Sequence, residues 1–185
     1  MTIPNILTLL RIALIPVLIA LLFLDGVQTR WWAFGLFSVL AFTDYLDGYL
    51  ARKLDQQSEL GALLDPIADK VLIAALIVAL VGTSDIARWD IAGAILILCR
   101  EFLVSGLREF LGQRNLPLPV TTLAKWKTTV QLVAIGWFIA PALTVPGQAF
   151  TTSAIWWFAT ALTLTTGYDY VTSATDQIRQ QNQDS

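Results

Sequence analysis

Six long apolar segments separated by short polar connections constrain the fold of this chain more than any other feature. An α-helix needs about 20 apolar residues to cross the hydrocarbon of a bilayer. Hydrophobic residues make up 56% of the chain and charged residues 14%, whereas soluble domains carry roughly 25% charged residues. The sequence therefore predicts an all-α, polytopic membrane protein with six transmembrane helices, near residues 6–24, 31–52, 63–83, 89–112, 122–144 and 149–170.

The distribution of positive charge predicts the orientation of these helices. Cytoplasmic loops carry an excess of Lys and Arg. The first and third connections hold Arg30 and Arg88, whereas five cations lie around the second and fourth: Arg52, Lys53, Arg114, Lys125 and Lys127. With an even number of helices, both termini are expected on the cytoplasmic side.

Neither an internal repeat nor a Pro/Gly-rich linker divides the chain. We therefore expect one six-helix transmembrane domain, the part of the chain that would carry any catalysis, over residues 1–172. Residues 173–185 are polar and lack the apolar side chains needed to build a core, so they are predicted to be a cytoplasmic tail.

The chain contains no histidine and one cysteine, Cys99. The lack of histidine excludes His-based general acid–base catalysis, phosphohistidine intermediates, Ser-His and Cys-His nucleophiles, and zinc sites of the HExxH type. A single cysteine cannot form an internal disulfide. Any chemistry must therefore rely on carboxylates and metal ions.

Two pairs of aspartates flank the connection between the second and third apolar segments. Asp44 and Asp47 are three residues apart and Asp65 and Asp69 are four apart, so each pair shares one face of a helix. Both pairs lie at the predicted cytoplasmic ends of their helices. The sequence therefore predicts that four carboxylates converge at one membrane face.

Four clustered carboxylates need compensating positive charge, because each costs at least a few kcal/mol in hydrocarbon and they repel one another. Arg52 and Lys70 are nearby but are too few. Divalent metal is the better explanation, since hard cations such as Mg²⁺ take oxygen ligands. The alternatives are acids solvated at helix ends or held in structural salt bridges.

Small residues continue the acidic faces: Gly48 and Ala51 follow the first pair, and Gly61 precedes the second. Small residues in membrane helices permit close helix packing. They also permit close approach of a ligand, and the two interpretations are compatible.

Together these residues form DYLDGYLAR at 44–52 and GALLDPIAD at 61–69, which match the signature of the CDP-alcohol phosphotransferase family at every defined position and spacing. Within that family the chain resembles the bacterial phosphatidylglycerophosphate synthases in four further stretches: PNILTLLR at 4–11, LDPIADK at 64–70, REFLVSGLRE at 100–109 and KWKT at 125–128. The resemblance covers most of the chain.

The resemblance implies a six-helix homodimer in the bacterial cytoplasmic (inner) membrane, active on the cytoplasmic side. It implies transfer of a phosphatidyl group from CDP-diacylglycerol to sn-glycerol 3-phosphate, giving phosphatidylglycerophosphate and CMP. It also implies a requirement for two Mg²⁺ or Mn²⁺ ions.

The same resemblance assigns roles to individual residues. Asp44, Asp47, Asp65 and Asp69 would hold the metal ions, and Asp69 would also be the general base. The residues bordering CDP-diacylglycerol would be Asn5, Thr8, Arg11, Gly48, Ala51, Arg52 and Gly61. For the N-terminal residues, which share a helical face, helix capping and an interfacial arginine are the structural alternatives.

Four cations are candidates for binding the phosphate of the acceptor: Arg100, Arg108, Lys125 and Lys127. A phosphomonoester dianion needs several donors, and Arg can bind it through two hydrogen bonds. Arg100 and Arg108 are eight residues apart, hence near one face of a helix. The alternatives are loop charges that set the topology and ion pairs with Glu101 or Glu109.

Other functions stay open at this point. Phosphatidylinositol-phosphate, phosphatidylserine and cardiolipin synthases of the same fold differ in their acceptor. A cation transporter would use intramembrane carboxylates along a path, and a non-catalytic scaffold would leave the acids unexplained. No nucleic-acid partner is expected.

Overall fold

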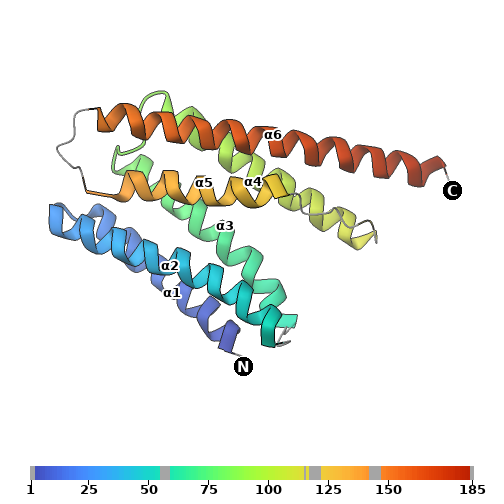
Figure 1. Ribbon diagram of the computed structural model, residues 1–185, viewed down its shortest axis with the longest axis horizontal. Helices are drawn as coiled ribbons and strands as arrows, with labels where there is room; N and C mark the ends of the chain where they lie inside the picture. Colours follow the sequence, from blue (N-terminus) through green and yellow to red (C-terminus); the bar gives the residue numbers. More distant parts are fainter. Residues whose placement is uncertain (1–2, 55–58, 115, 117–121, 142–146, 184–185) are drawn as a thin grey trace. The chain divides into compact units, whose positions relative to one another are not determined.

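The computed structural model describes residues 3–54, 59–114, 116, 122–141 and 147–183 (Figure 1). None of these residues forms a β-strand, and all the helices are α-helices, so the all-α prediction is confirmed. Each predicted apolar segment lies largely within one helix. The helices are α1 (Ile3–Phe23), α2 (Val27–Leu54), α3 (Glu59–Gly82), α4 (Asp90–Gln113), α5 (Thr122–Ile139) and α6 (Gln148–Gln183).

The helices do not end where the apolar segments end. At 28 and 36 residues, α2 and α6 continue into polar sequence at their C-terminal ends. Measured over the described residues, no helix meets the combined requirement of length and apolarity for crossing a membrane.

The chain divides into two compact units. The first contains Met1–Ala87 and Ile135–Gln148, and the second contains Arg88–Ala134 and Ala149–Ser185. Helix α5 contributes its first part to the second unit and its last residues to the first.

In the first unit, α1 packs against both α2 and α3 (Figure 1). Buried side chains recur every three or four residues on each helix, which is the spacing of one helical face. Because these faces meet, they form a continuous apolar core: Ile15, Leu18 and Leu22 on α1, Ala33, Phe37 and Leu40 on α2, and Leu72, Leu76 and Leu80 on α3.

In the second unit, buried residues of α4 pack against α6, and α5 adds buried polar side chains. The start of α4 is joined to α6 through Asp90. Its carboxylate accepts hydrogen bonds from Ser153 Oγ at 2.7 Å and Trp157 Nε1 at 3.0 Å, and its carbonyl accepts one from Trp156 Nε1 at 2.9 Å. The indole of Trp156 is fully buried. A Cβ on Gly93 would lie 2.6 Å from Trp156 Nε1, so the helices approach this closely only because residue 93 is glycine.

The stretch predicted to be a polar tail, residues 173–185, continues α6 as far as Gln183. Tyr170, Ala174 and Ile178 are spaced four residues apart, so they lie on one face of the helix. That face packs against Val104 and Leu111 of α4. Few apolar residues are needed here because a neighbouring helix supplies the rest of the cluster.

Candidate functional site

The two acid pairs lie on two different helices of the first unit. Asp44 and Asp47 are in α2 and Asp65 and Asp69 are in α3. The side chain of Asp69 is described, whereas those of Asp44, Asp47 and Asp65 lie outside the described residues. Within the described part of the chain, no group of three or more His, Cys, Asp or Glu side chains could hold a metal ion.

Asp69 is bound to the N-terminal helix. Arg11 Nη1 donates a hydrogen bond to Asp69 Oδ1 at 2.9 Å, joining residues 58 positions apart. The Arg11 side chain is 1% exposed, whereas the Asp69 side chain is 51% exposed. The buried cation thus holds a carboxylate that stays open to a ligand.

The helical faces explain this contact. On α1, Thr8 and Arg11 extend the buried stripe of Ile15 and Leu18, so the stripe changes from apolar to polar toward its N-terminal end. Thr8 is fully buried. The predicted shared face of the N-terminal residues is therefore real for Thr8 and Arg11, and it faces the core of the first unit.

Asp69 is suited to a divalent cation by its chemistry, because Mg²⁺ and Mn²⁺ prefer carboxylate oxygens and need an accessible one. The side-chain positions of several other predicted site residues lie outside the described part of the structure. These are Asn5 of α1, Gly48, Ala51 and Arg52 of α2, Gly61 of α3 and Lys125 of α5.

Three of the predicted acceptor-binding cations lie together in the second unit. Glu101 Oε1 accepts from Lys127 Nζ and from Arg100 Nη1, the latter at 3.4 Å. Arg100 Nη2 also donates to Thr166 Oγ1 of α6 at 3.1 Å. The guanidinium carbons of Arg100 and Arg108 lie 5.7 and 5.5 Å from the centre of the Tyr170 ring. We call Arg100, Glu101, Arg108, Lys127 and Tyr170 the cationic cluster.

The cationic cluster is largely enclosed at its base and open at its rim. The side chains of Arg100 and Lys127 are 9% and 5% exposed, whereas Arg108 is exposed. Arg100 and Lys127 share the carboxylate of Glu101, and Arg108 adds a third positive charge, so the cluster carries an excess of positive charge. Charges of one sign in a poorly solvated place are stable only with a counter-ion, so the cluster is chemically suited to bind an anion.

Unused hydrogen-bonding groups are buried on the helices that carry the cationic cluster. Arg100 Nε, Gln131 Oε1 and Thr163 Oγ1 are buried and have no hydrogen-bond partner among the described residues. Buried polar groups are rarely left unpaired unless a ligand or water completes them. These atoms therefore offer both donors and acceptors to a polar ligand.

Glycine at position 167 lets Arg100 lie across α6. A Cβ there would be 2.8 Å from Arg100 Cγ, closer than real contacts of this kind. Thr166, which precedes it, supplies the hydroxyl that accepts from Arg100. The position of Arg100 is thus set by two consecutive residues of a helix that the sequence did not connect with the site.

Sequence reasoning missed the contributions of Thr166, Gly167 and Tyr170. A signal was present in the spacing of Thr160, Thr163, Thr166 and Tyr170, which places polar groups on one face of an apolar helix. Glu101 is one of the ion-pair partners that the sequence offers to the arginines. It contacts Arg100 and also Lys127, whereas Glu109 accepts a hydrogen bond from Gln113 Nε2 at 3.2 Å.

Comparison with known sequences adds to this geometry. The profile of the CDP-alcohol phosphatidyltransferase family matches residues 1–165. A protein of Rickettsia bellii is 41% identical over 174 residues, covering 90% of this chain and 92% of that protein. A protein of Escherichia coli strain K12 is 37% identical over 176 residues, covering 93% and 94%. Both are named CDP-diacylglycerol–glycerol-3-phosphate 3-phosphatidyltransferase.

A protein of the same name from Cereibacter sphaeroides is 50% identical over 135 residues. The match covers 72% of this chain and 61% of that protein, so it spans less than two thirds of the relative's length. The profile match includes the helices that carry Arg11, both acid pairs and the three cations of the cationic cluster. The chain belongs to the CDP-alcohol phosphatidyltransferase family.

Proposed function

We propose that this chain is an integral membrane enzyme that transfers the phosphatidyl group of CDP-diacylglycerol to sn-glycerol 3-phosphate. The products are phosphatidylglycerophosphate and CMP. Family membership and the shared name of the relatives support the reaction class and the substrates. The structural observation that carries the proposal is the contact of buried Arg11 with half-exposed Asp69, the last acid of the signature.

The acidic residues of α2 and α3 form the proposed metal site. Asp44, Asp47, Asp65 and Asp69 would hold two Mg²⁺ or Mn²⁺ ions. Such ions, when bound, supply charge neutralisation for the diphosphate and for the leaving CMP. Asn5, Thr8, Arg11, Gly48, Ala51, Arg52 and Gly61 would border the CDP-diacylglycerol, the small residues by permitting close approach.

Asp69 is the proposed general base. Its carboxylate would take the proton from the attacking hydroxyl of glycerol 3-phosphate as the new bond to phosphorus forms and the bond to CMP breaks. The exposed half of the side chain leaves a carboxylate edge available, while Arg11 fixes its orientation. A positioned base of this kind contributes typically 10²- to 10⁴-fold to the rate.

The cationic cluster is the proposed site for the phosphate of the acceptor. Arg100 and Lys127 are already placed by Glu101, Thr166 and Gly167. Arg108 is exposed at the rim and could reach an incoming anion, and Lys125 would add a further charge. A phosphorylated alcohol matches the excess positive charge, whereas an uncharged alcohol or the zwitterion serine would leave it uncompensated.

Insertion in a membrane is part of the proposal. Large apolar side chains are exposed on several helices, including Phe42 at 61%, Val78 at 64% and Phe158 at 61%. Exposed apolar surface of this extent is unusual for a protein surrounded by water. Both termini and the active site would face the cytoplasm of a bacterial inner membrane, and the enzyme would act as a homodimer.

The decisive experiment supplies purified protein with Mg²⁺ and CDP-diacylglycerol, adds one candidate acceptor at a time, and measures CMP release and the lipid formed. The acceptors are sn-glycerol 3-phosphate, inositol phosphate, serine and phosphatidylglycerol. Of the four acceptors, we expect only glycerol 3-phosphate to support rapid CMP release. Chelation of the metal should abolish that release. Turnover with another acceptor would move the chain to a different branch of the family, and ion flux in liposomes without CMP release would contradict the enzymatic proposal.

A further inference from the structure

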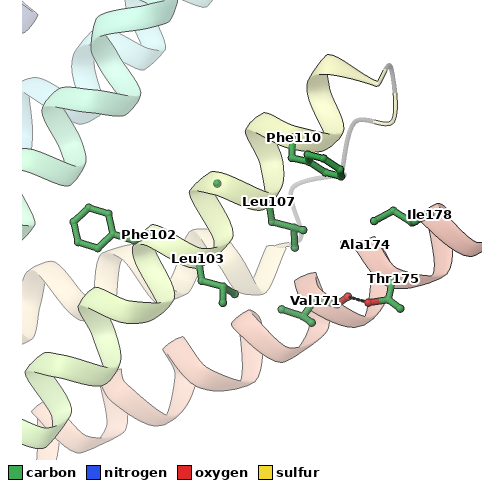
Figure 2. A pocket seen from close by; sticks show the side chains of 9 residues that line it. Phe102, Leu103, Leu107, Phe110, Val171, Ala174, Thr175 and Ile178 are labelled. Carbon is green, nitrogen blue, oxygen red and sulfur yellow. Dashed lines mark hydrogen bonds between the residues drawn. The ribbon is translucent and has the colours of Figure 1, made fainter.

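An open groove of about 420 Å³ runs between α4 and α6 in the second unit (Figure 2). Its walls come from the C-terminal halves of both helices. Nine residues line it: Phe102, Leu103, Gly106, Leu107, Phe110, Val171, Ala174, Thr175 and Ile178.

The walls of the groove offer almost no hydrogen-bonding groups. Thr175 carries the only side-chain hydroxyl among the lining residues, and its Oγ1 donates to the carbonyl of Val171 at 2.8 Å. Phe102 and Leu103 are more than half exposed. A Cβ on Gly106 would meet nothing within 4 Å, so the groove is open where α4 has no side chain. The groove therefore fits a flexible apolar chain.

Positive charge lies at one end of the groove. The guanidinium of Arg114 lies 4.3 Å from the centre of the Phe110 ring, which forms part of the wall. Arg179 is exposed and follows Thr175 by one turn of α6. Arg108 does not belong to this end, because its guanidinium lies over Tyr170 in the cationic cluster.

We propose that the groove binds one acyl chain of an anionic phospholipid, with the lipid phosphate at Arg114 and Arg179. An apolar channel that ends at two exposed guanidinium groups matches the two chemical parts of such a lipid. If the chain spans the membrane as proposed above, α6 is much longer than the roughly 30 Å of hydrocarbon requires, so its polar C-terminal part reaches the headgroup level.

The same charges argue against a second copy of this chain as the occupant. A two-fold interface uses the same patch on both partners. With the two-fold axis along the membrane normal, such an interface would bring Arg114 and Arg179 of the two copies to the same end, without acidic lining residues to offset them. None of the lining residues belongs to the cationic cluster, and a test of lipid binding needs no turnover.

The first test fills the groove. Gly106→Leu places a side chain in open space within a helix, where it also removes the helix-destabilising effect of glycine. Gly106→Ala gives a similar helical benefit without filling the groove and is the matched control. Native mass spectrometry of the full chain in detergent would measure retention of dioleoyl phosphatidylglycerol and dioleoyl phosphatidylcholine. We expect Gly106→Leu to weaken phosphatidylglycerol binding about tenfold and the control to change it less than twofold.

The second test removes the charge. Arg114→Gln should lower the preference for phosphatidylglycerol over phosphatidylcholine about fivefold, because one cation near a lipid headgroup contributes that much attraction. Arg114→Lys should retain most of the preference. Arg88→Gln removes an exposed arginine at another place in the same unit and should leave the preference unchanged.

Three results would overturn the proposal. If Gly106→Leu binds phosphatidylglycerol as well as the unaltered protein does, the acyl chain lies elsewhere. A preference that survives Arg114→Gln would remove the headgroup contact. Loss of dimer in the Gly106→Leu spectra with lipid retention unchanged would assign the groove to a second copy instead.

Discussion

At the scale of single residues, the candidate functional groups of the two units are held in the same way. In the first unit, buried Arg11 holds the half-exposed carboxylate of Asp69. In the second, Glu101 holds the largely buried Arg100 and Lys127. In each case an opposite charge fixes a functional group before substrate arrives, which limits the reorganisation needed during binding and reaction.

Replacing the proposed base tests the first pair. Asp69→Asn keeps a hydrogen-bond acceptor for Arg11 but removes the proton acceptor, so we expect CMP release to fall by about 10³-fold. Binding of CDP-diacylglycerol, measured by equilibrium titration, should persist. Asp176→Asn, an exposed acid of α6, is the control and should retain full activity. Turnover within twofold of normal in Asp69→Asn would exclude this residue as the base.

Removing the exposed Arg108 tests the proposed role of the cationic cluster in acceptor binding. Arg108→Ala should raise KM for glycerol 3-phosphate about tenfold or more, because a charge-assisted hydrogen bond contributes roughly 1.5–3 kcal/mol. KM for CDP-diacylglycerol should change little. Arg88→Ala controls for loss of one exposed positive charge. Equal effects on the two KM values would argue against a role for Arg108 in acceptor binding.

At the scale of helices, glycines decide how closely α4 and α6 approach. Gly93 makes room for the buried Trp156 near one end of the contact, and Gly167 makes room for Arg100 near the middle. Farther along, Ala174 and Ile178 continue the contact beyond the apolar segment of α6. The packing of α4 against α6 therefore depends on glycines that make room for large side chains and on a surface that is partly polar.

Adding one methyl group at Gly167 should affect both stability and acceptor binding. In Gly167→Ala the new Cβ must displace Arg100, which is typical overpacking and costs about 1–3 kcal/mol. We expect Tm to fall by about 5 °C and KM for glycerol 3-phosphate to rise several-fold.

Two further glycine variants separate these effects. Gly93→Ala, which meets Trp156, should lower Tm without changing KM. Gly112→Ala meets no atom within 4 Å and should leave both unchanged. An unchanged KM in Gly167→Ala would show that Arg100 is structural only.

At the scale of the whole molecule, the proposed topology makes its own prediction. In a chain freed of its native thiol by Cys99→Ser, single cysteines at Ser84 and Gln180 would report the two sides of the membrane. Both positions are exposed. The positive-inside rule places the α3–α4 connection outside and the C-terminus inside. A membrane-impermeant maleimide should label Ser84→Cys in intact spheroplasts, and Gln180→Cys only after lysis; the reverse pattern would overturn the orientation.

The sequence by itself determined the helical character of the molecule and the chemistry of its candidate site. Apolar runs of this length favour α-helices, because a segment placed in a bilayer would have to pair every backbone group within itself. The spacing of Asp65 and Asp69, and of Arg100 and Arg108, follows from the helical repeat alone. The composition also shows that histidine is absent, which limits the possible catalytic chemistry to carboxylates and metal ions.

Only the tertiary structure decided which residues meet across helices. Arg11 and Asp69 are 58 positions apart, and Arg100 and Thr166 are 66 apart. Local periodicity says which face a residue occupies but not which neighbour covers that face. The helical course of residues 173–183 was missed for the same reason, since a polar segment with few apolar residues is held by packing on α4 rather than by its own propensity.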